Sequence, residues 1–292
     1  NFEATNVAVY FGEPGKEVKD PYFDGKGPTR TGCTHCGACM TGCRHNAKNT
    51  LDKNYLHLAQ QLGTEIWAEK EVIDVKPLNE NGSEGYEIEI KDSTKFFKKK
   101  QKIRTKGVVF SGGVIGSVKL LLQLKQKGSL PNLSKQLGLN IRTNNEALLP
   151  VTSINRQGKD YSKGLAIGSI LHTDENTHLE PCRYSPGSGF WRMLMVPMVS
   201  GSNVFSRVGK TLLQIIKKPV AFLKLVFVKD WAKSTPIILF MQTIDSTLKF
   251  SLNGIGRMNS TVSEGDKPSP FIKEAHDIAN EFADIIDGVP TN

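Results

Sequence analysis

The spacing of apolar residues predicts a helix in the first quarter of the chain. From Leu51 to Leu62, apolar side chains recur every three to four positions, which places them on one face of an amphipathic helix. Thr50 is the expected N-cap of this helix, and Gly63 is the expected stop after its C-terminus. A second amphipathic helix is predicted near the end of the chain, at 271–286.

Strand-like alternation surrounds the first helix and dominates the second half of the chain. A strand is predicted at 4–11, and a loop rich in glycine, proline and aspartate follows at 12–32. The segments after the helix have the pattern of an antiparallel meander, and more strands are expected beyond residue 147. These predicted strands are 64–68, 71–77, 86–90, the basic run 95–106, 107–111, 151–155, 165–172, 177–183, 236–245 and 247–252.

Length and composition are those of a folded protein with one large or two ordinary domains. The chain has 292 residues, of which 38% are hydrophobic and 23% are charged, and this balance excludes a disordered chain. Much of the formal net charge of +9 comes from the basic run 95–106. That run predicts the solvated face and turn of a hairpin rather than a surface for nucleic acid.

No targeting or membrane-spanning segment is predicted. No window approaches the ~18 uncharged apolar residues that a transmembrane helix needs, and no signal peptide is recognisable. The chain opens on Asn1 in what has the pattern of mid-domain sequence, so a processed or incomplete chain is expected. The expected location is cytoplasmic, with peripheral membrane contact as an alternative.

Four of the five cysteines lie close together, at Cys33, Cys36, Cys39 and Cys43. The spacing C-x2-C-x2-C-x3-C lets four thiolates converge on one centre and matches the run that ligates iron–sulfur clusters in bacterial ferredoxins. It differs from that run because Arg44 replaces the usual proline and no second set of cysteines follows. Zinc prefers CxxC pairs that lie further apart. The motif leaves two interpretations open, an iron–sulfur site and four packed thiols without a metal.

A glycine turn connects the apolar segment 107–111 to a predicted helix. Gly112, Gly113 and Gly116 form this turn, and Ser117 follows. Glycines in such a connection let the backbone approach a cofactor, and the N-terminus of the helix favours anions. A tight connection that binds nothing has the same pattern, so both interpretations stay open.

His178 and Glu180 lie two positions apart on a predicted strand and therefore point to the same face. The surrounding region is rich in apolar residues such as Phe190 and Trp191. A carboxylate in such surroundings is expected to have a raised pKa and to serve as a general base. The alternative is an exposed pair on an edge strand. Cys182 is expected to be a core thiol.

The stretch 208–231 is both apolar and basic, and Pro219 interrupts it. Such a stretch can lie on a membrane surface or line an apolar substrate. The favoured interpretation is an ordinary pair of amphipathic helices packed on the core.

Several of these segments together resemble the glucose–methanol–choline (GMC) flavin oxidoreductases, and in particular their cholesterol-oxidase-like branch. The resemblance covers nearly the whole chain, and the combination is specific even where single pieces are weak. The matching segments are DPYF at 20–23, the cysteine cluster, KNTLDKNYL at 48–56, GVVFSGGVIGS at 107–117, RTNNE at 142–146, THLEP at 177–181 and MQTID at 241–245.

The resemblance implies FAD as the cofactor and assigns residues to it. In the family, the backbone at Val72 passes along the adenine, and the glycine turn lies near the cofactor. Glu180 falls where a glutamate of cholesterol oxidases acts as a base on the steroid. The cofactor-binding residues that the resemblance implies are Lys48, Asn49, Val72, Gly112, Gly113 and Ser117.

The resemblance also implies a fold of the α+β or α/β class. A partial FAD-binding domain of the glutathione-reductase-like type, with an antiparallel meander, is expected beside a substrate domain built on a mixed sheet. The implied parts are a cap with the cysteine-rich loop at 1–46, a partial FAD-binding domain at 47–146 and a partial substrate-binding domain at 147–292.

Two motifs of the family do not occur in these residues. They are the N-terminal G-x-G-x-x-G unit, which holds the pyrophosphate, and the C-terminal histidine motif. A central fragment of a flavoenzyme is therefore expected, one that is inactive alone and does not bind FAD tightly.

The implied reaction is hydride transfer to FAD from the CH–OH group of a hydrophobic alcohol or sterol. The electrons then pass to oxygen, or to a redox partner through an iron–sulfur cluster, as in some related dehydrogenases. The rival hypothesis is an iron–sulfur or zinc-binding electron-transfer module in which the four cysteines are the whole function.

Overall fold

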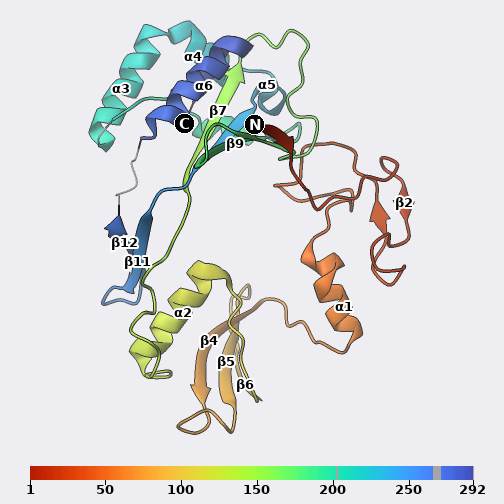
Figure 1. Ribbon diagram of the computed structural model, residues 1–292, viewed down its shortest axis with the longest axis vertical. Coiled ribbons are helices and arrows are strands. Elements are labelled where there is room, and N and C mark those ends of the chain that lie inside the picture. The colour runs from red at the N-terminus through yellow and green to blue at the C-terminus, as the bar shows by residue number, and fades with distance from the viewer. Residues whose placement is uncertain (202, 266–270, 292) are drawn as a thin grey trace. The chain divides into compact units, whose positions relative to one another are not determined.

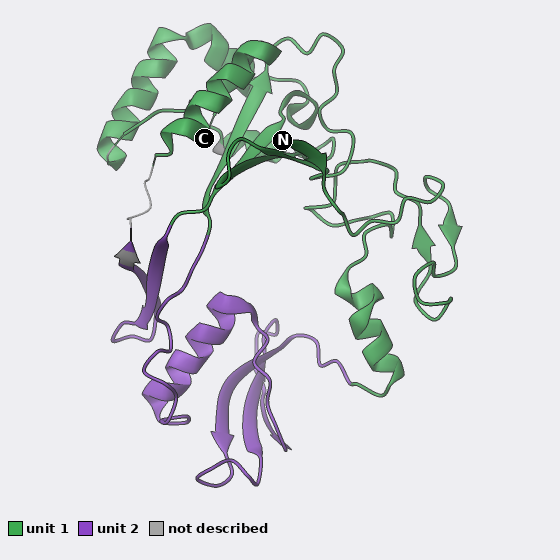
Figure 2. Ribbon diagram, viewed as in Figure 1, with its two compact units in different colours: residues 1–64, 144–244, 268–292 green, residues 65–143, 245–267 purple. Residues whose placement is uncertain are grey.

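The computed structural model describes residues 1–201, 203–265 and 271–291, which form two compact units (Figure 1, Figure 2). Unit 1 contains the described parts of 1–64, 144–244 and 268–292, and unit 2 contains those of 65–143 and 245–267. The chain therefore leaves unit 1 for unit 2 twice and returns each time. Both units combine helices with antiparallel sheets.

Unit 1 is organised around a six-stranded sheet with the order β1-β8-β9-β10-β7-β13. Along the chain, helices lie between the strands of this sheet. A separate two-stranded sheet of β2 and β3 lies in the N-terminal loop region. The strands of unit 1 are β1 (Phe2–Ala4), β2 (Glu17–Val18), β3 (Arg30–Thr31), β7 (Asn145–Ser153), β8 (Ser169–His172), β9 (Thr177–Cys182), β10 (Ile237–Gln242) and β13 (Gly288–Pro290). Its helices are η1 (Leu51–Lys53), α1 (Tyr55–Gln61), η2 (Gly189–Leu194), α3 (Val204–Lys217), α4 (Pro219–Val226), α5 (Trp231–Ser234) and α6 (Lys273–Ile286).

The predicted mixed sheet is wrong for these strands, because every described pair of neighbours in the six-stranded sheet is antiparallel. The connection between β9 and β10 gives the reason. β9 ends at Cys182 and β10 begins at Ile237, which is the registered partner of Cys182. The helical excursion between the two strands thus leaves and re-enters the sheet at the same end. A parallel pair would require a crossover to the opposite end.

Each face of the central strand β10 contributes to a separate apolar cluster. Phe240, which is fully buried, packs on one face with the small side chains Ala275, Ala279 and Ala283 of α6. Alanines spaced by four residues lie on one side of a helix and let it approach the sheet closely. On the other face, Leu239 packs in a cluster that includes the buried Trp231.

The first predicted helix is confirmed, but its N-cap lies later than expected. The helix is α1, and η1 precedes it. The side chain of Asn54 accepts a hydrogen bond from the first backbone N–H of α1, whereas the side chain of Thr50 makes no capping bond. Gly63 has a φ of +93°, which favours glycine and confirms the predicted stop.

Unit 2 contains the predicted antiparallel meander. β5 lies between β4 and β6, and Lys100 and Lys102 of the basic run pair with glutamates of β5. A hairpin of β11 and β12 contacts α2. The elements of unit 2 are β4 (Lys70–Pro77), β5 (Tyr86–Asp92), β6 (Lys100–Thr105), α2 (Gly113–Lys127), β11 (Ser246–Leu252) and β12 (Met258–Gly265).

A buried carboxylate connects α2 to the meander. Lys127 Nζ at the end of α2 lies 2.7 Å from Asp74 Oδ2 on β4, and Lys76 Nζ lies 3.6 Å from the same oxygen. Burial by itself would raise the pKa of Asp74, but the hydrogen bonds and positive charges around it outweigh burial and lower that pKa. Asp74 therefore stays ionised and paired at neutral pH.

Two predicted strands, 64–68 and 107–111, do not form in the described part of the chain, and of the predicted strand 4–11 only Ala4 lies in a strand, β1. Val109 in the segment 107–111 is 88% exposed. Strand conformation requires a hydrogen-bonding neighbour, and no described strand pairs with either segment.

Candidate functional site

A hollow of about 430 Å³ lies in unit 2 at the start of α2. It gathers three residues that the sequence assigns to the cofactor, namely Val72 of β4, Gly112 before the helix and Ser117 in its first turns. Ile88 of β5 and Leu120 of α2 are among the other apolar residues that line it. These two residues were not predicted, although Leu120 follows Gly116 by one helical turn and so lies on the same face.

The glycines at this hollow leave the start of α2 open. Gly112 is the N-cap and provides no side-chain capping bond, while its N–H donates to Ser117 Oγ over 3.0 Å. A Cβ atom added at Gly113 or Gly116 would meet no atom within 4 Å. Gly113 has a φ of +72° and is not part of the lining. Open space, apolar walls and the N–H groups of a helix start together suit a flat ring system with an anionic tail.

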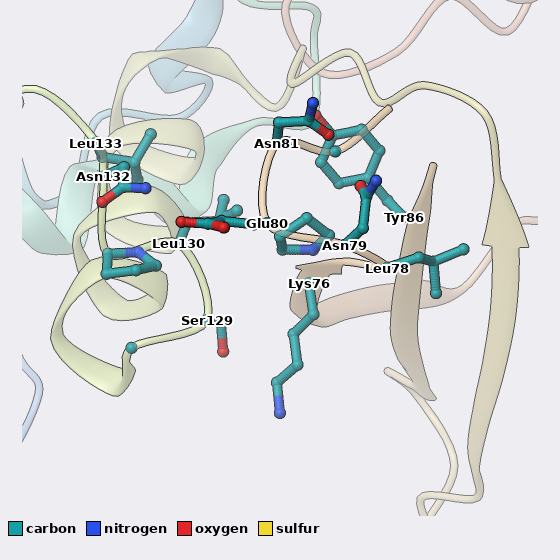
Figure 3. A pocket seen from close by; sticks show the side chains of 14 residues that line it. Lys76, Leu78, Asn79, Glu80, Asn81, Tyr86, Ser129, Leu130, Asn132 and Leu133 are labelled. Carbon is teal, nitrogen blue, oxygen red and sulfur yellow. The ribbon is translucent and has the colours of Figure 1, made fainter. Parts of the chain in front are cut away.

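A larger hollow of about 800 Å³ lies beyond the opposite end of α2 (Figure 3). There the turn residues Asn79 and Asn81 face Leu130 and Asn132, and Glu80 lies between them. None of the predicted site residues lines it. The C-terminal end of a helix carries partial negative charge and disfavours an anionic ligand. The smaller hollow is therefore the better candidate for a phosphate-bearing cofactor.

In unit 1, backbone hydrogen bonds close the cysteine loop at its base. Cys33 N–H donates to Tyr10 O over 3.0 Å, and Tyr10 N–H donates to Ala47 O over 2.9 Å. Further along the loop, Gly37 N–H donates to Gly164 O over 2.9 Å. Gly37 has a φ of +71°, and a Cβ atom there would lie 2.3 Å from Ser162 O. Glycine at this position thus allows the loop to approach the 162–164 segment.

The four clustered cysteines border one small cavity of about 10 Å³, and none forms a disulfide. The donor type is right for an iron–sulfur cluster, but a cavity of this size holds about one water molecule. Among the described residues, no three His, Cys, Asp or Glu side chains are arranged to hold a metal ion. The side-chain arrangement of the loop therefore does not fit a cluster, and no step of the chemistry is assigned to one.

The local environment shifts the pKa values of the two cysteines at the ends of the loop in opposite directions. Burial raises the pKa of Cys33, and the other three cysteines add to that rise. Burial would also raise the pKa of Cys43, but backbone N–H groups of residues 45, 47 and 48 outweigh it and lower this pKa. Hydrogen bonds to sulfur favour the thiolate. Cys43 is therefore the more readily ionised of the two.

Lys48 and Asn49 lie beside the cysteine loop in unit 1. Lys48 borders the cysteine cavity, and its Nζ donates to Cys39 O over 3.0 Å. Asn49 Oδ1 accepts a hydrogen bond of 2.9 Å from the buried guanidinium of Arg30. These contacts hold the loop and the start of the next helix together. The cofactor roles of both residues stay predictions.

Glu180 lies half-buried in the middle of β9, directly opposite Leu239 of β10. Its neighbours on the same face of the strand are His178 and Cys182, because side chains alternate along a strand. Their partners on β10 are Met241 and Ile237. The predicted common face of His178 and Glu180 is therefore confirmed, and β9 is an inner strand of the sheet rather than an edge.

A second carboxylate, Glu146 of β7, belongs to the same face. It pairs with Met241, which pairs with His178 on the other side. Burial raises the pKa of Cys182 to about 11, and the negative charges of Glu180 and Glu146 contribute to the rise. Cys182 is 2% exposed, which confirms the predicted core thiol. Only the strand register brings Glu146 to this face, so the sequence pattern carried no signal for it.

Comparison with known proteins finds a family match for part of the chain. The family model for GMC oxidoreductases matches residues 28–141, which include the cysteine loop, the meander and the start of α2. In this region the chain is similar to the GMC oxidoreductases.

Curated relatives match the chain over almost all of its length. A cholesterol oxidase of Acinetobacter baumannii is 40% identical over 301 residues, which cover 99% of this chain and 54% of that protein. Cholesterol oxidases of two Mycobacterium tuberculosis strains, CDC 1551 / Oshkosh and H37Rv, are each 34% identical over 300 residues, covering 98% of this chain and 51% of theirs. The chain thus spans about half the length of the curated relatives it matches.

Proposed function

We propose that these residues belong to an FAD-dependent oxidoreductase that oxidises the CH–OH group of a hydrophobic alcohol, with a sterol as the preferred class. The hollow at the start of α2 supports this most directly, because it gathers Val72, Gly112 and Ser117 from separate parts of unit 2. The similarity to cholesterol oxidases supports the sterol class. Oxygen or a redox partner takes up the electrons.

In this proposal, Val72, Gly112 and Ser117 would hold FAD, which would supply the hydride acceptor for the carbinol carbon. The carboxylate of Glu180 accepts the hydroxyl proton, so that the alcohol becomes a ketone or aldehyde as one hydride and one proton leave. Apolar side chains on the same face, among them Leu148 and Met241, bind the hydrocarbon part of the substrate. The partial FAD-binding domain at 47–146 and the substrate domain at 147–292 are part of the same proposal.

The substitution Gly116→Phe tests the cofactor hollow. The new ring has room, because a Cβ atom at Gly116 meets nothing within 4 Å, and it would occupy space that Gly116 lines. We expect the affinity for added FAD to fall by about tenfold or more, since a filled site must lose contacts worth at least ~1.4 kcal/mol. Titration of the protein with FAD, followed by flavin fluorescence, measures this.

Ile115→Phe is the matched control. Ile115 occupies the same turn of α2, is 66% exposed and does not line the hollow. Its substitution should leave FAD affinity unchanged. Equal affinities of the two variants would contradict the assignment of the hollow to FAD.

The alternative function, an iron–sulfur electron-transfer module, finds no support in the structure. Cys33, Cys36, Cys39 and Cys43 border one cavity, but that cavity is too small for a cluster. This candidate requires stoichiometric iron and acid-labile sulfide in anaerobically purified protein, and Cys36→Ser should remove both. Protein that lacks iron but still binds FAD would exclude the iron–sulfur module and leave the flavoenzyme as the remaining candidate.

A further inference from the structure

The helix α3 carries an apolar stripe that faces away from the protein. Phe205, Val208, Leu212 and Ile216 follow one another at intervals of three and four residues, so they form one row along the helix. These side chains are 88%, 54%, 56% and 74% exposed. No residue of α3 is buried.

The next helix, α4, carries a second exposed apolar row. Val220 and Leu223 of this helix and Phe227 just after it form a second row, and they are 64%, 53% and 76% exposed. Leu225, on the opposite side of α4, is the one buried residue of that helix. The two helices contact each other at the outer margin of unit 1 (Figure 1). The predicted packing of this helix pair on the core is therefore wrong for the apolar rows.

The side of α3 away from its apolar row faces the body of unit 1. Lys210, Leu213, Gln214 and Lys217 of α3 line a hollow together with His276, Asp277 and Asn280 of α6. The polar side of α3 thus lies toward the protein and its apolar side toward the outside. A surface helix that only covered a core would have the reverse orientation.

The charge of this segment has a single sign. Residues 203–229 contain six basic residues and no acidic residue. The basic residues are Arg207, Lys210, Lys217, Lys218, Lys224 and Lys229. Exposed apolar rows on a uniformly cationic helix pair match a surface that is apolar inside and anionic outside.

We propose that α3 and α4 dock on the surface of a membrane that contains anionic lipid. The apolar rows enter the boundary between headgroups and acyl chains, and the exposed Lys218 and Lys224, which do not line the hollow against α6, remain at the level of the lipid phosphates. No described helix is long and apolar enough to cross a membrane, so the pair lies on the surface. This inference is independent of the proposed oxidation, because it rests on the helices alone.

Vesicle binding by the purified chain tests the proposal without any measurement of activity. We expect the chain to co-sediment with vesicles of phosphatidylcholine and phosphatidylglycerol, and much less with vesicles of phosphatidylcholine alone. Raising the salt from about 0.1 M to about 1 M should weaken binding, because the screening length falls from ~10 Å to ~3 Å. The double variant Phe205→Ser/Ile216→Ser should lower the partition coefficient by about tenfold or more, since two large side chains no longer enter the lipid.

Phe96→Ser/Phe97→Ser is the matched control. These phenylalanines of unit 2 are 93% and 85% exposed, so the control removes as much exposed apolar surface from another place. Circular dichroism should show both double variants folded, since all four positions are exposed. An equal loss of binding in both variants, or no binding to anionic vesicles, would overturn the proposal.

Two other partners could cover the apolar rows of α3 and α4, and each would give a different result. A second copy of the chain would appear as a dimer in light scattering, and Phe205→Ser/Ile216→Ser would dissociate it. Polypeptide outside these residues would protect the rows in a longer natural form of the protein, whose vesicle binding would then not respond to the variant. Either result would contradict membrane docking.

Discussion

In a flavin-loaded longer form of the protein, Glu180→Gln is expected to lower turnover by about 10²- to 10⁴-fold, the range typical of a lost general base. The amide keeps the size of the side chain but cannot accept the hydroxyl proton of the alcohol. Glu180 lies half-buried on an inner strand, opposite Leu239, where the substitution removes the charge and leaves the packing in place. Steady-state oxidation of a sterol and of a long-chain alcohol, with kcat and KM determined separately, measures the effect.

Glu175→Gln is the control for this prediction. Glu175 is exposed in the turn between β8 and β9, so the variant makes the same chemical change a few residues away. It should keep normal turnover, and both variants should bind the same amount of flavin. Normal turnover of Glu180→Gln in the presence of bound flavin would rule out Glu180 as the base.

Phe240→Ala is expected to lower the free energy of unfolding by about 3–5 kcal/mol, the usual cost of removing a buried aromatic ring. Phe240 is fully buried on β10, with β7 on one side and β9 on the other. Its ring packs near Ala275 and Ala279 of α6, whose short side chains cannot fill the space that it leaves. Urea unfolding followed by circular dichroism measures the change.

Two substitutions calibrate this result. Phe240→Leu keeps most of the volume and should cost clearly less than the alanine variant. Phe205→Ala removes a ring that is 88% exposed and should change the free energy of unfolding by no more than about 0.5 kcal/mol. Equal costs for Phe240→Ala and Phe205→Ala would contradict the position of Phe240 in the core.

The predictions that depend on neighbours in the sequence are largely confirmed. The helix that ends before Gly63, the meander, the break at Pro219 and the final helix all appear in the structure. Each rests on a short-range cause, such as the period of a helix, the alternation of a strand, the φ angle that glycine permits or the missing N–H of proline. The expected cap at Thr50 failed, because Thr50 precedes the short helix η1 and α1 begins only after Asn54, whose side chain accepts from the N–H of Tyr55.

The candidate cofactor hollow was predicted in part. The sequence supplied Val72, Gly112 and Ser117 through the family resemblance, but it did not predict Ile88 and Leu120, which also line the hollow. The hollow forms because strands β4 and β5 and the helix α2 pack in one unit. Which side chains face a shared hollow depends on that packing, and each segment alone is compatible with several arrangements.

The sequence by itself therefore determined the family resemblance, most of the local elements and the residue types available for chemistry, including four cysteines within one short loop. Only the tertiary structure decided that Glu146 shares a face with Glu180, that the unit 1 sheet is antiparallel and that the apolar rows of α3 and α4 face outward. The reason is physical. Periodicity and turn conformation follow from interactions within a few residues, whereas strand register and burial depend on partners that lie far away in the chain.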